Sequence, residues 1–328
     1  MTLKQPLGRL YAGLGIALVV LFIASLFAGK VWAPWSAFVD QSDPRWPIIF
    51  DLRLPRTILG VAVGGALGAC GAALQGYTRN PLADPGVLGV SSVASLGAVI
   101  TLYFGLAEAS AWLLPVGAMI GAIIGVLILL ALAGATSSVV TFILAGSILQ
   151  IIAIAGVSMA LSLAPNPWAV NEIVNWLLGS LSDRSIEEVR FALPFITVGV
   201  AILLTLRRSF DALTLGDAGA RSLGIDIDRT RILLALGVGL AVGASVAVTG
   251  MIGFVGLVTP HLLRPFVAAR PGALILPSAI GGAVIVLAAD ILVRLTPAAS
   301  EVKLGVAMAA IGGPFFLALL IRLRRRIA

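Results

Sequence analysis

Long apolar stretches alternate with short polar ones along most of this chain of 328 residues. About 20 apolar residues in a helix span the hydrocarbon core of a bilayer, so such stretches predict transmembrane helices. A shorter stretch, 252–268, contains two prolines and predicts a short, partial helix. Nine stretches are long enough, or nearly so, at 10–28, 57–76, 91–107, 112–135, 139–163, 191–206, 231–249, 274–295 and 304–321.

Composition supports this interpretation of the pattern. Hydrophobic residues make up 59% of the chain and charged residues 11%, whereas a soluble domain carries about 25% charged residues. We therefore expect an all-α polytopic membrane protein with ten transmembrane helices, in which residues 1–328 form a single transmembrane domain. An even number of helices would place both termini on one side. The net charge of +7 reflects Lys and Arg in cytoplasmic loops better than a nucleic-acid partner.

The orientation follows from these basic residues. If the N-terminus is cytoplasmic, most of the 22 Lys and Arg residues lie on the inner side, which favours both ends being cytoplasmic. The first apolar run follows Lys4 and Arg9 and also resembles a signal peptide. Its apolar core is longer than the usual 7–15 or so residues, and no clear small-x-small cleavage site follows. We therefore expect a retained first helix.

The most informative polar interruption is Arg79–Ser91, which contains Pro81 and Pro85. Proline cannot continue a helix, so both neighbouring runs must stop here. In lipid, broken backbone persists only where protein or a water-filled cavity covers it. The segment therefore indicates a transport pathway. Small residues recur every fourth position nearby and favour close packing of helices: Gly60, Gly64, Gly68, Ala72 and Gly76.

Two connecting segments carry apolar residues among polar ones. The inner loop 207–231 predicts two short helices punctuated by Gly216 and Gly224. Its leucines favour a docking surface for a soluble partner over an ordinary solvated connection. The outer segment 165–190 is amphipathic, and we expect Trp168 and Trp176 to anchor it at the membrane interface. The alternative is that this segment lines the mouth of a pathway.

Charged residues near the outer helix ends allow two interpretations. Asp290 and Arg294 are spaced i, i+4 and face one way, which predicts local charge pairing. Arg53 and Arg56 flank the start of the second helix. They are either snorkelling arginines or, together with Arg294, a surface for an acidic partner, because arginine pairs carboxylates in a bidentate fork.

Familiar catalytic and metal-binding patterns are missing from the sequence. The single histidine, His261, follows a proline, and the single cysteine, Cys70, lies in an apolar run, so both are expected to be structural. The sequence has no metal-ligand cluster and no G-x-x-x-x-G-K-[ST] motif. We therefore expect no metal site, no catalytic residue and no cofactor in this chain.

Several motifs, in order from about Arg53 to Arg322, resemble the permeases of bacterial ABC importers for iron-siderophores, haem and cobalamin. The motifs are Leu54-Pro55-Arg56, Gly71–Gln75, Asn80–Pro85 with Leu88–Ser91, Phe254–Val258 with Pro260, His261 and Arg264, Asp290 with Arg294, and Gly312–Phe316. One loop departs from the pattern. After Glu301 and Val302, this chain has Lys303-Leu304 where the family usually has Leu-Pro.

The resemblance implies an inner-membrane homodimer with the pathway between its subunits. It also implies two cytoplasmic ATPase subunits, which would bind ATP and Mg, and a periplasmic substrate-binding protein. By resemblance the loop 207–231 is the coupling segment, and Arg53, Arg56 and Arg294 receive acidic residues of the binding protein. The coupling residues would be Leu215, Gly216, Ala220, Arg221, Leu223 and Gly224, and the cytoplasmic gate would be Asn80, Leu82, Val139, Val140 and Thr141.

The function expected from these features is import of a metal chelate, an iron-siderophore or haem, by alternating access. The alternative within the family is cobalamin. An ion-coupled secondary transporter is the rival from another class, and such proteins usually keep acidic residues at membrane depth. Here Asp290 is the carboxylate well inside an apolar run, and Arg294 is its expected partner.

Overall fold

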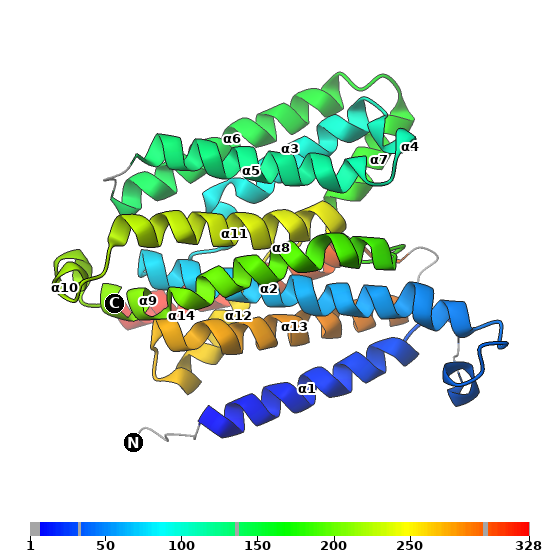
Figure 1. Cartoon of the computed structure of the whole chain (residues 1–328), viewed down its shortest axis with the longest axis horizontal. Helices are drawn as coiled ribbons and strands as arrows, with labels where there is room; N and C mark the ends of the chain where they lie inside the picture. Colours follow the sequence, from blue (N-terminus) through cyan, green and yellow to red (C-terminus); the bar gives the residue numbers. More distant parts are fainter. Residues whose placement is uncertain (1–6, 32–33, 135–137, 298–300, 328) are drawn as a thin grey trace.

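The computed structural model describes residues 7–31, 34–134, 138–297 and 301–327, which form helices and turns with no strand among them. Each of the ten apolar stretches contains one main helix (Figure 1). These helices are α1 (Leu7–Phe27), α2 (Leu54–Thr78), α3 (Val90–Tyr103), α5 (Leu113–Ala133), α6 (Val139–Ser162), α8 (Ile186–Thr205), α11 (Ile227–Thr249), α12 (Val255–Leu263), α13 (Pro271–Leu295) and α14 (Leu304–Ile327).

Short helices occupy the connections. They are η1 (Trp35–Phe38), η2 (Ile48–Arg53), η3 (Pro85–Leu88), α4 (Leu106–Ala109), α7 (Pro167–Leu177), α9 (Arg207–Leu213), α10 (Gly216–Ser222) and η4 (Arg264–Val267). In the described part of the chain, seven helices are long and apolar enough to cross a membrane, α2 being counted together with η2. The helices α3 and α14 provide shorter apolar segments, and α12 has only nine residues. Polytopic membrane architecture is therefore confirmed, while the count of ten crossings stays a prediction.

Several helix boundaries differ by a few residues from those expected from hydropathy, and two of them have a clear local cause. The helix α8 begins at Ile186 rather than 191 because Ser185 and Glu188 form a capping box that hydropathy does not register. The helix α3 ends at Tyr103 because Gly105, at φ +65°, turns the chain into α4. Polar start signals and glycine turns fixed these ends, and a count of apolar residues detects neither.

The centre of the bundle is α2, which packs most extensively on α13 (Figure 1). Small residues make this contact possible. A Cβ added at Gly64 would lie 2.4 Å from the carbonyl oxygen of Gly282, and one added at Gly68 would lie 2.0 Å from that of Ser278. Small residues at spacing four thus let the two backbones touch, as predicted for this face of α2.

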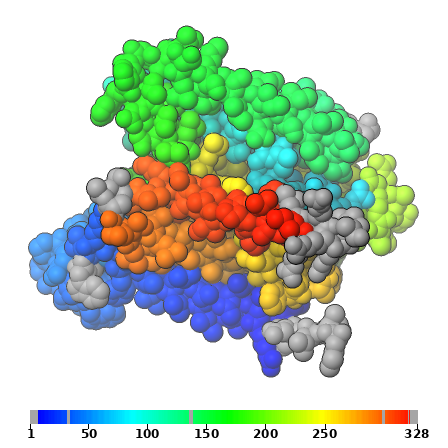
Figure 2. Space-filling view, turned by 180° about the vertical axis from the view of Figure 1, so that it is seen from behind, coloured from blue at the N-terminus to red at the C-terminus, as the bar shows by residue number. Residues whose placement is uncertain are grey.

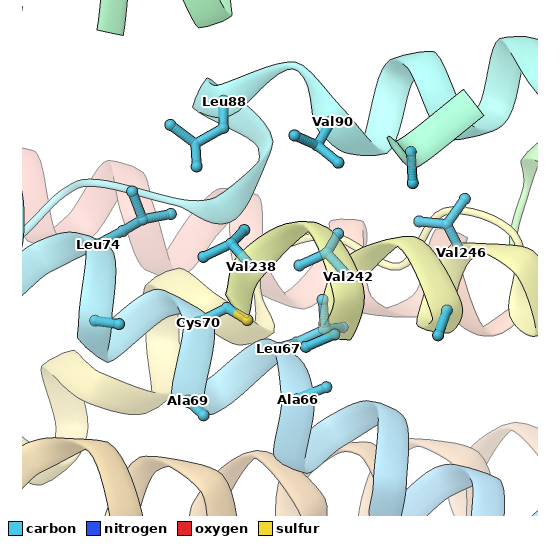
Figure 3. Packing of buried hydrophobic residues seen from close by; sticks show 14 of the residues in the cluster. Ala66, Leu67, Ala69, Cys70, Leu74, Leu88, Val90, Val238, Val242 and Val246 are labelled. Atoms are coloured by element: carbon cyan, nitrogen blue, oxygen red, sulfur yellow. The ribbon is translucent and has the colours of Figure 1, made fainter. Parts of the chain in front are cut away.

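The other side of α2 faces α11. Figure 3 shows Leu67 and Cys70 of α2 beside Val238 and Val242 of α11, with Leu88 of the proline-containing segment lying over them. Cys70 is fully buried in this cluster, so its expected role as a small packed residue is confirmed. The later part of the broken segment, around Leu88, is therefore part of the hydrophobic core.

The amphipathic prediction for 165–190 is correct for the helix but wrong for one of its tryptophans. The helix α7 begins at Pro167 after Asn166, whose Oδ1 accepts a hydrogen bond from the Ala169 amide at 2.9 Å. Trp168 is 80% exposed and can serve as an anchor, whereas Trp176 is 9% exposed and packs in the core. The indole of Trp176 faces inward because it shares the buried side of α7 with Ile173.

The start of α1, the helix α10 and the end of α14 lie at the same end of the bundle (Figure 1). This arrangement agrees with both termini being on one side of the membrane. Which side is cytoplasmic stays a prediction. The opposite end carries η2 and α7 and is called the outer end below, following the expected orientation.

Candidate functional site

Side-chain caps and glycines shape the segment between α2 and α3. The helix α2 ends at Thr78, and Arg79 takes a left-handed conformation at φ 54°. The Leu82 amide then donates to Asn80 Oδ1, and the Gly86 amide donates to Asp84 Oδ1, both at 2.9 Å. These Asx turns replace the helical hydrogen bonds that the prolines remove. The predicted break is therefore confirmed, with its backbone held by its own side chains.

A side chain of α2 and a distant arginine of η4 support this break. The Gln75 Nε2 group lies 3.4 Å from the Ala83 carbonyl oxygen and 3.5 Å from that of Gly256, at the start of α12. Arg264 then donates through Nη2 to Gln75 Oε1 at 2.6 Å. A Cβ at Gly71 would lie 1.9 Å from the Gly256 oxygen, so α12 and α2 also touch directly. Protein groups thus cover the irregular backbone, which is the condition for its persistence in lipid.

A cavity of about 300 Å³ lies beside the break, near the middle of α2. Figure 2 shows a hollow in the surface between α6 and α14, with the colours of the break and of α11 and α12 at its floor. Five helices and the break contribute to the cavity. Its lining residues are Val63, Leu67, Asp84, Pro85, Gly86, Ser91, Ser92, Gln150, Ile154, Val242, Ser245, Val246, Thr249, Gly250, Met251, Ile252, Gly253 and Gly256.

The predicted gate residues lie around this region without forming one cluster. Asn80 is exposed and Leu82 is half-buried at the inner end of the break. On α6, Val139 is half-buried and Val140 and Thr141 are exposed. The break approaches α6 further along, where a Cβ at Gly146 would lie 2.3 Å from the Val87 carbonyl oxygen. Closure of a gate by these five residues stays a prediction.

A charged cluster joins three parts of the chain at the outer end. Arg56 donates to Asp290 Oδ1 at 2.7 Å and to both oxygens of Glu301. Arg294 Nη2 lies 2.9 Å from Asp290 Oδ2, so the predicted i, i+4 pair is confirmed. Asp290 is fully buried between the two guanidinium groups. Burial alone would raise the pKa of Glu301, but the hydrogen bonds and charge of Arg56 outweigh it and lower that pKa.

Arg53 and Arg294 also hold the end of α1. Arg53 Nη1 donates to the carbonyl oxygens of Leu26 and Phe27 at 2.9 and 3.0 Å, and Arg294 Nη1 donates to that of Ser25 at 2.9 Å. Cations at a helix C-terminus satisfy its last carbonyls and oppose the helix dipole. Both arginines are buried, so they act first as internal connections.

The three arginines nevertheless share a second cavity of about 300 Å³, which Lys30 and Glu301 also line. Of the two interpretations that the sequence left open, snorkelling does not describe Arg53 and Arg294, which are buried and bonded to the end of α1. Docking at Arg53, Arg56 and Arg294 stays a prediction, now confined to the guanidinium edges that reach this cavity.

The inner loop forms the two short helices that its glycines predicted, α9 and α10. Gly216 and Gly224 have φ of +83° and +79°, a region that favours glycine. Leu215 and Leu223 are 66% and 62% exposed and Arg221 is exposed, whereas Ala220 is buried. The loop thus presents two exposed leucines that flank the small helix α10, at the end of the bundle (Figure 1).

An ion pair connects this helix to the break. Arg79 Nη2 lies 3.0 Å from Asp217 Oδ1, so α10 contacts the residue that terminates α2. Sequence patterns did not predict this pair, the Gln75–Arg264 bridge or the polar lining of the cavity. One signal was available, because a polar residue such as Gln75 inside an apolar span marks a buried partner.

The single histidine lies in a packed environment. The His261 ring packs edge-on against Phe315, with centroids 6.0 Å apart. Within the described ranges, no three His, Cys, Asp or Glu side chains gather in a way that could hold a metal ion.

Comparisons with known proteins fit this architecture. The FecCD transport family matches residues 17–322. The chain is 36% identical to the vitamin B12 import system permease protein BtuC of Vibrio cholerae, over 97% of this chain and 94% of that protein. It is 35% identical to the Fe(3+) dicitrate transport system permease protein FecD of Escherichia coli, over 94% of this chain and 97% of that one.

A solved structure shares the whole fold. It is described as an inward-facing conformation of a putative metal-chelate type ABC transporter. Its TM-score to this chain is 0.87 at 30% identity, covering 96% of this chain and 99% of the other. Together with the helices long enough to span a membrane, these matches show that the chain is a multi-pass membrane permease belonging to the FecCD transport family.

Proposed function

We propose that this chain is the permease subunit of an ATP-driven importer that moves a metal chelate across the inner membrane. Two copies would enclose the pathway, with two ATPase subunits beneath α10 and a binding protein at the outer end. The observation that carries the proposal is the contact of α10 with the break. The exposed Leu215 and Leu223 form a docking surface, and Asp217 on the same helix pairs with Arg79.

This contact supplies a route from the ATPase to the pathway. A displacement of α10 acts through Asp217 on Arg79, which begins the break that lines the cavity. The two side chains are 41% and 48% exposed. Such half-exposed pairs contribute only about 0–1 kcal/mol, which suits a contact that must break and re-form in each transport cycle. Binding and hydrolysis of ATP by the partner subunits would thereby switch the side to which the pathway opens.

The outer cavity supports docking of a binding protein at the other end. Its lining includes Lys30 and three arginines, against Asp183 and Glu301. An acidic side chain entering it would gain charge-assisted hydrogen bonds. Docking should weaken as salt rises, because salt screens such charges.

The cargo that we propose is an iron-siderophore or haem. Cobalamin is the second candidate, and the similarity to vitamin B12 permeases supports it equally. Ion-coupled transport has less support. Asp290, the carboxylate expected to serve it, is held by Arg56 and Arg294.

Uptake by proteoliposomes that contain the permease with its ATPase and binding protein tests the proposal. We expect ATP-dependent accumulation of a chelate, loss of uptake in Asp217→Arg, and recovery when Arg79→Asp is added. The matched control is Glu187→Arg, which breaks a more exposed pair on α8 and should keep uptake. Uptake by the permease alone under an ion gradient, or normal uptake in Asp217→Arg, would contradict the proposal.

A further inference from the structure

The cavity beside the break differs in chemistry from the cavity at the outer end. None of the residues that line it in the described part of the chain is Lys or Arg, whereas four line the outer cavity. The acidic side chain among its lining residues is that of Asp84. The Gly86 amide donates to Oδ1, and no hydrogen bond from the described residues reaches Oδ2. One carboxylate oxygen therefore remains to accept a bond from a ligand.

The uncharged polar groups around Asp84 come from three helices. Ser91 and Ser92 belong to α3, Gln150 belongs to α6, and Thr249 belongs to α11. The Thr249 hydroxyl donates to the Ser245 carbonyl oxygen at 2.9 Å, so towards the cavity it can only accept. The wall therefore offers acceptors and neutral amide or hydroxyl groups. A carboxylate entering this site would face the acidic side chain of Asp84, with no Lys or Arg among the described lining residues to balance its own charge.

The size of the cavity sets how much of a ligand it can take. About 300 Å³ is the lower limit of pockets that bury a whole drug-sized ligand. A metal chelate would therefore place one edge here. The rest of the chelate would lie in the hollow between α6 and α14 that Figure 2 shows.

We propose that this cavity is a subsite for the uncharged or cationic hydrogen-bonding edge of a chelate, such as the amide or ammonium groups of a ferric trihydroxamate. Polyanionic chelates such as ferric citrate are excluded from it. This inference rests on the proposed function and narrows its substrate class.

Thiol labelling tests the charge of the cavity without any transport. Cys70 is the single native cysteine and is fully buried, so Ser91→Cys adds the only accessible thiol. The purified protein in nanodiscs is treated with a cationic or an anionic methanethiosulfonate reagent, and labelling is followed by intact mass. Ser222→Cys on the exposed helix α10 is the reference.

We expect the cation-to-anion rate ratio at Ser91→Cys to exceed the reference ratio about fivefold or more, as a nearby unit charge predicts. Asp84→Asn keeps the acceptor for the Gly86 amide and should abolish the excess. A ratio equal to the reference, or no labelling where Ser222→Cys reacts, would overturn the proposal.

Protection by chelates tests the ligand class. The cationic ferric complex of desferrioxamine B should slow labelling of Ser91→Cys, whereas ferric citrate at equal concentration should not. Protection by ferric citrate alone, or equally by both, would overturn the assigned class. The two proposals fail separately. If the chain imports no chelate, the charge-dependent rates persist without protection, and if only the subsite is wrong, ATP-driven uptake persists while the rates show no charge dependence.

Discussion

The charged cluster at the outer end makes a quantitative prediction about stability. Asp290 is fully buried, 2.7 Å from Arg56 and 2.9 Å from Arg294. The variant Asp290→Ala removes the buried carboxylate that pairs with both guanidinium groups and leaves these two like charges close to each other. The backbone carbonyls of α1 still accept from Arg294, so the helix end is kept and the loss isolates the ion pairs.

The expected magnitude follows from burial. Removing one partner of a buried ion pair costs about 3–5 kcal/mol, because the remaining charge stays desolvated and unpaired. Glu301 still contacts Arg56, which places the loss near the lower limit, at about 3 kcal/mol. The matched control is Glu187→Ala. It breaks the Arg190 pair, whose side chains are 68% and 51% exposed, and should cost about 0–1 kcal/mol.

The measurement is the free energy of unfolding in detergent micelles, from tryptophan fluorescence during denaturant titration, with both variants prepared identically. Asp290→Ala should unfold at a clearly lower denaturant concentration than Glu187→Ala. If both lose the same free energy, the cluster does not stabilise the fold in the way that its burial implies.

Three further predictions use the inner loop, the outer loop and the histidine. Gly224→Val should insert normally and lose chelate uptake. The control Gly105→Val, which also has a positive φ and open space but lies on an outer turn, should keep uptake, and equal uptake by both would make α10 a plain connector. The pKa of Glu301 is lowered, so its bond to Arg56 stabilises the protein fully above pH 4.5 and loses that effect as pH falls through the native pKa. Glu301→Gln should therefore be less stable than wild type at pH 7 but not in strong acid. A stability difference independent of pH would refute this role of the Glu301–Arg56 bond. His261→Ala should leave the optical spectrum of a bound chelate unchanged, whereas a shifted ligand-field or Soret band would show that His261 coordinates the metal.

Hydropathy predicted where the helices lie because lipid demands about 20 apolar residues from any spanning helix. Local rules also predicted well. Glycine spacing marked the ends of α10, and the i, i+4 spacing marked the pairing of Asp290 with Arg294. Each of these features depends on residues that are close in sequence.

The missed features depend on residues far apart in sequence. Arg56 and Asp290 are separated by 234 positions, and nothing in either neighbourhood selects the other. The amphipathic pattern of its own helix predicts Trp176 at the membrane interface, but the core that covers it comes from other helices. The cavity likewise needs six segments brought together. The sequence around a residue predicts how polar its surroundings are, whereas the tertiary fold determines which groups form those surroundings.

The pairing of α2 with α13 also imposes an order in time. Gly64 touches Gly282, which the ribosome adds about 220 residues later. At a synthesis rate of roughly 5–20 residues per second, about 10–45 s pass between the synthesis of α2 and that of α13, on which it packs most extensively. During that interval its small-residue face meets lipid or an insertion factor instead of α13. The N-terminal half of the chain therefore cannot reach its final packing until α13, in the last third, has been made.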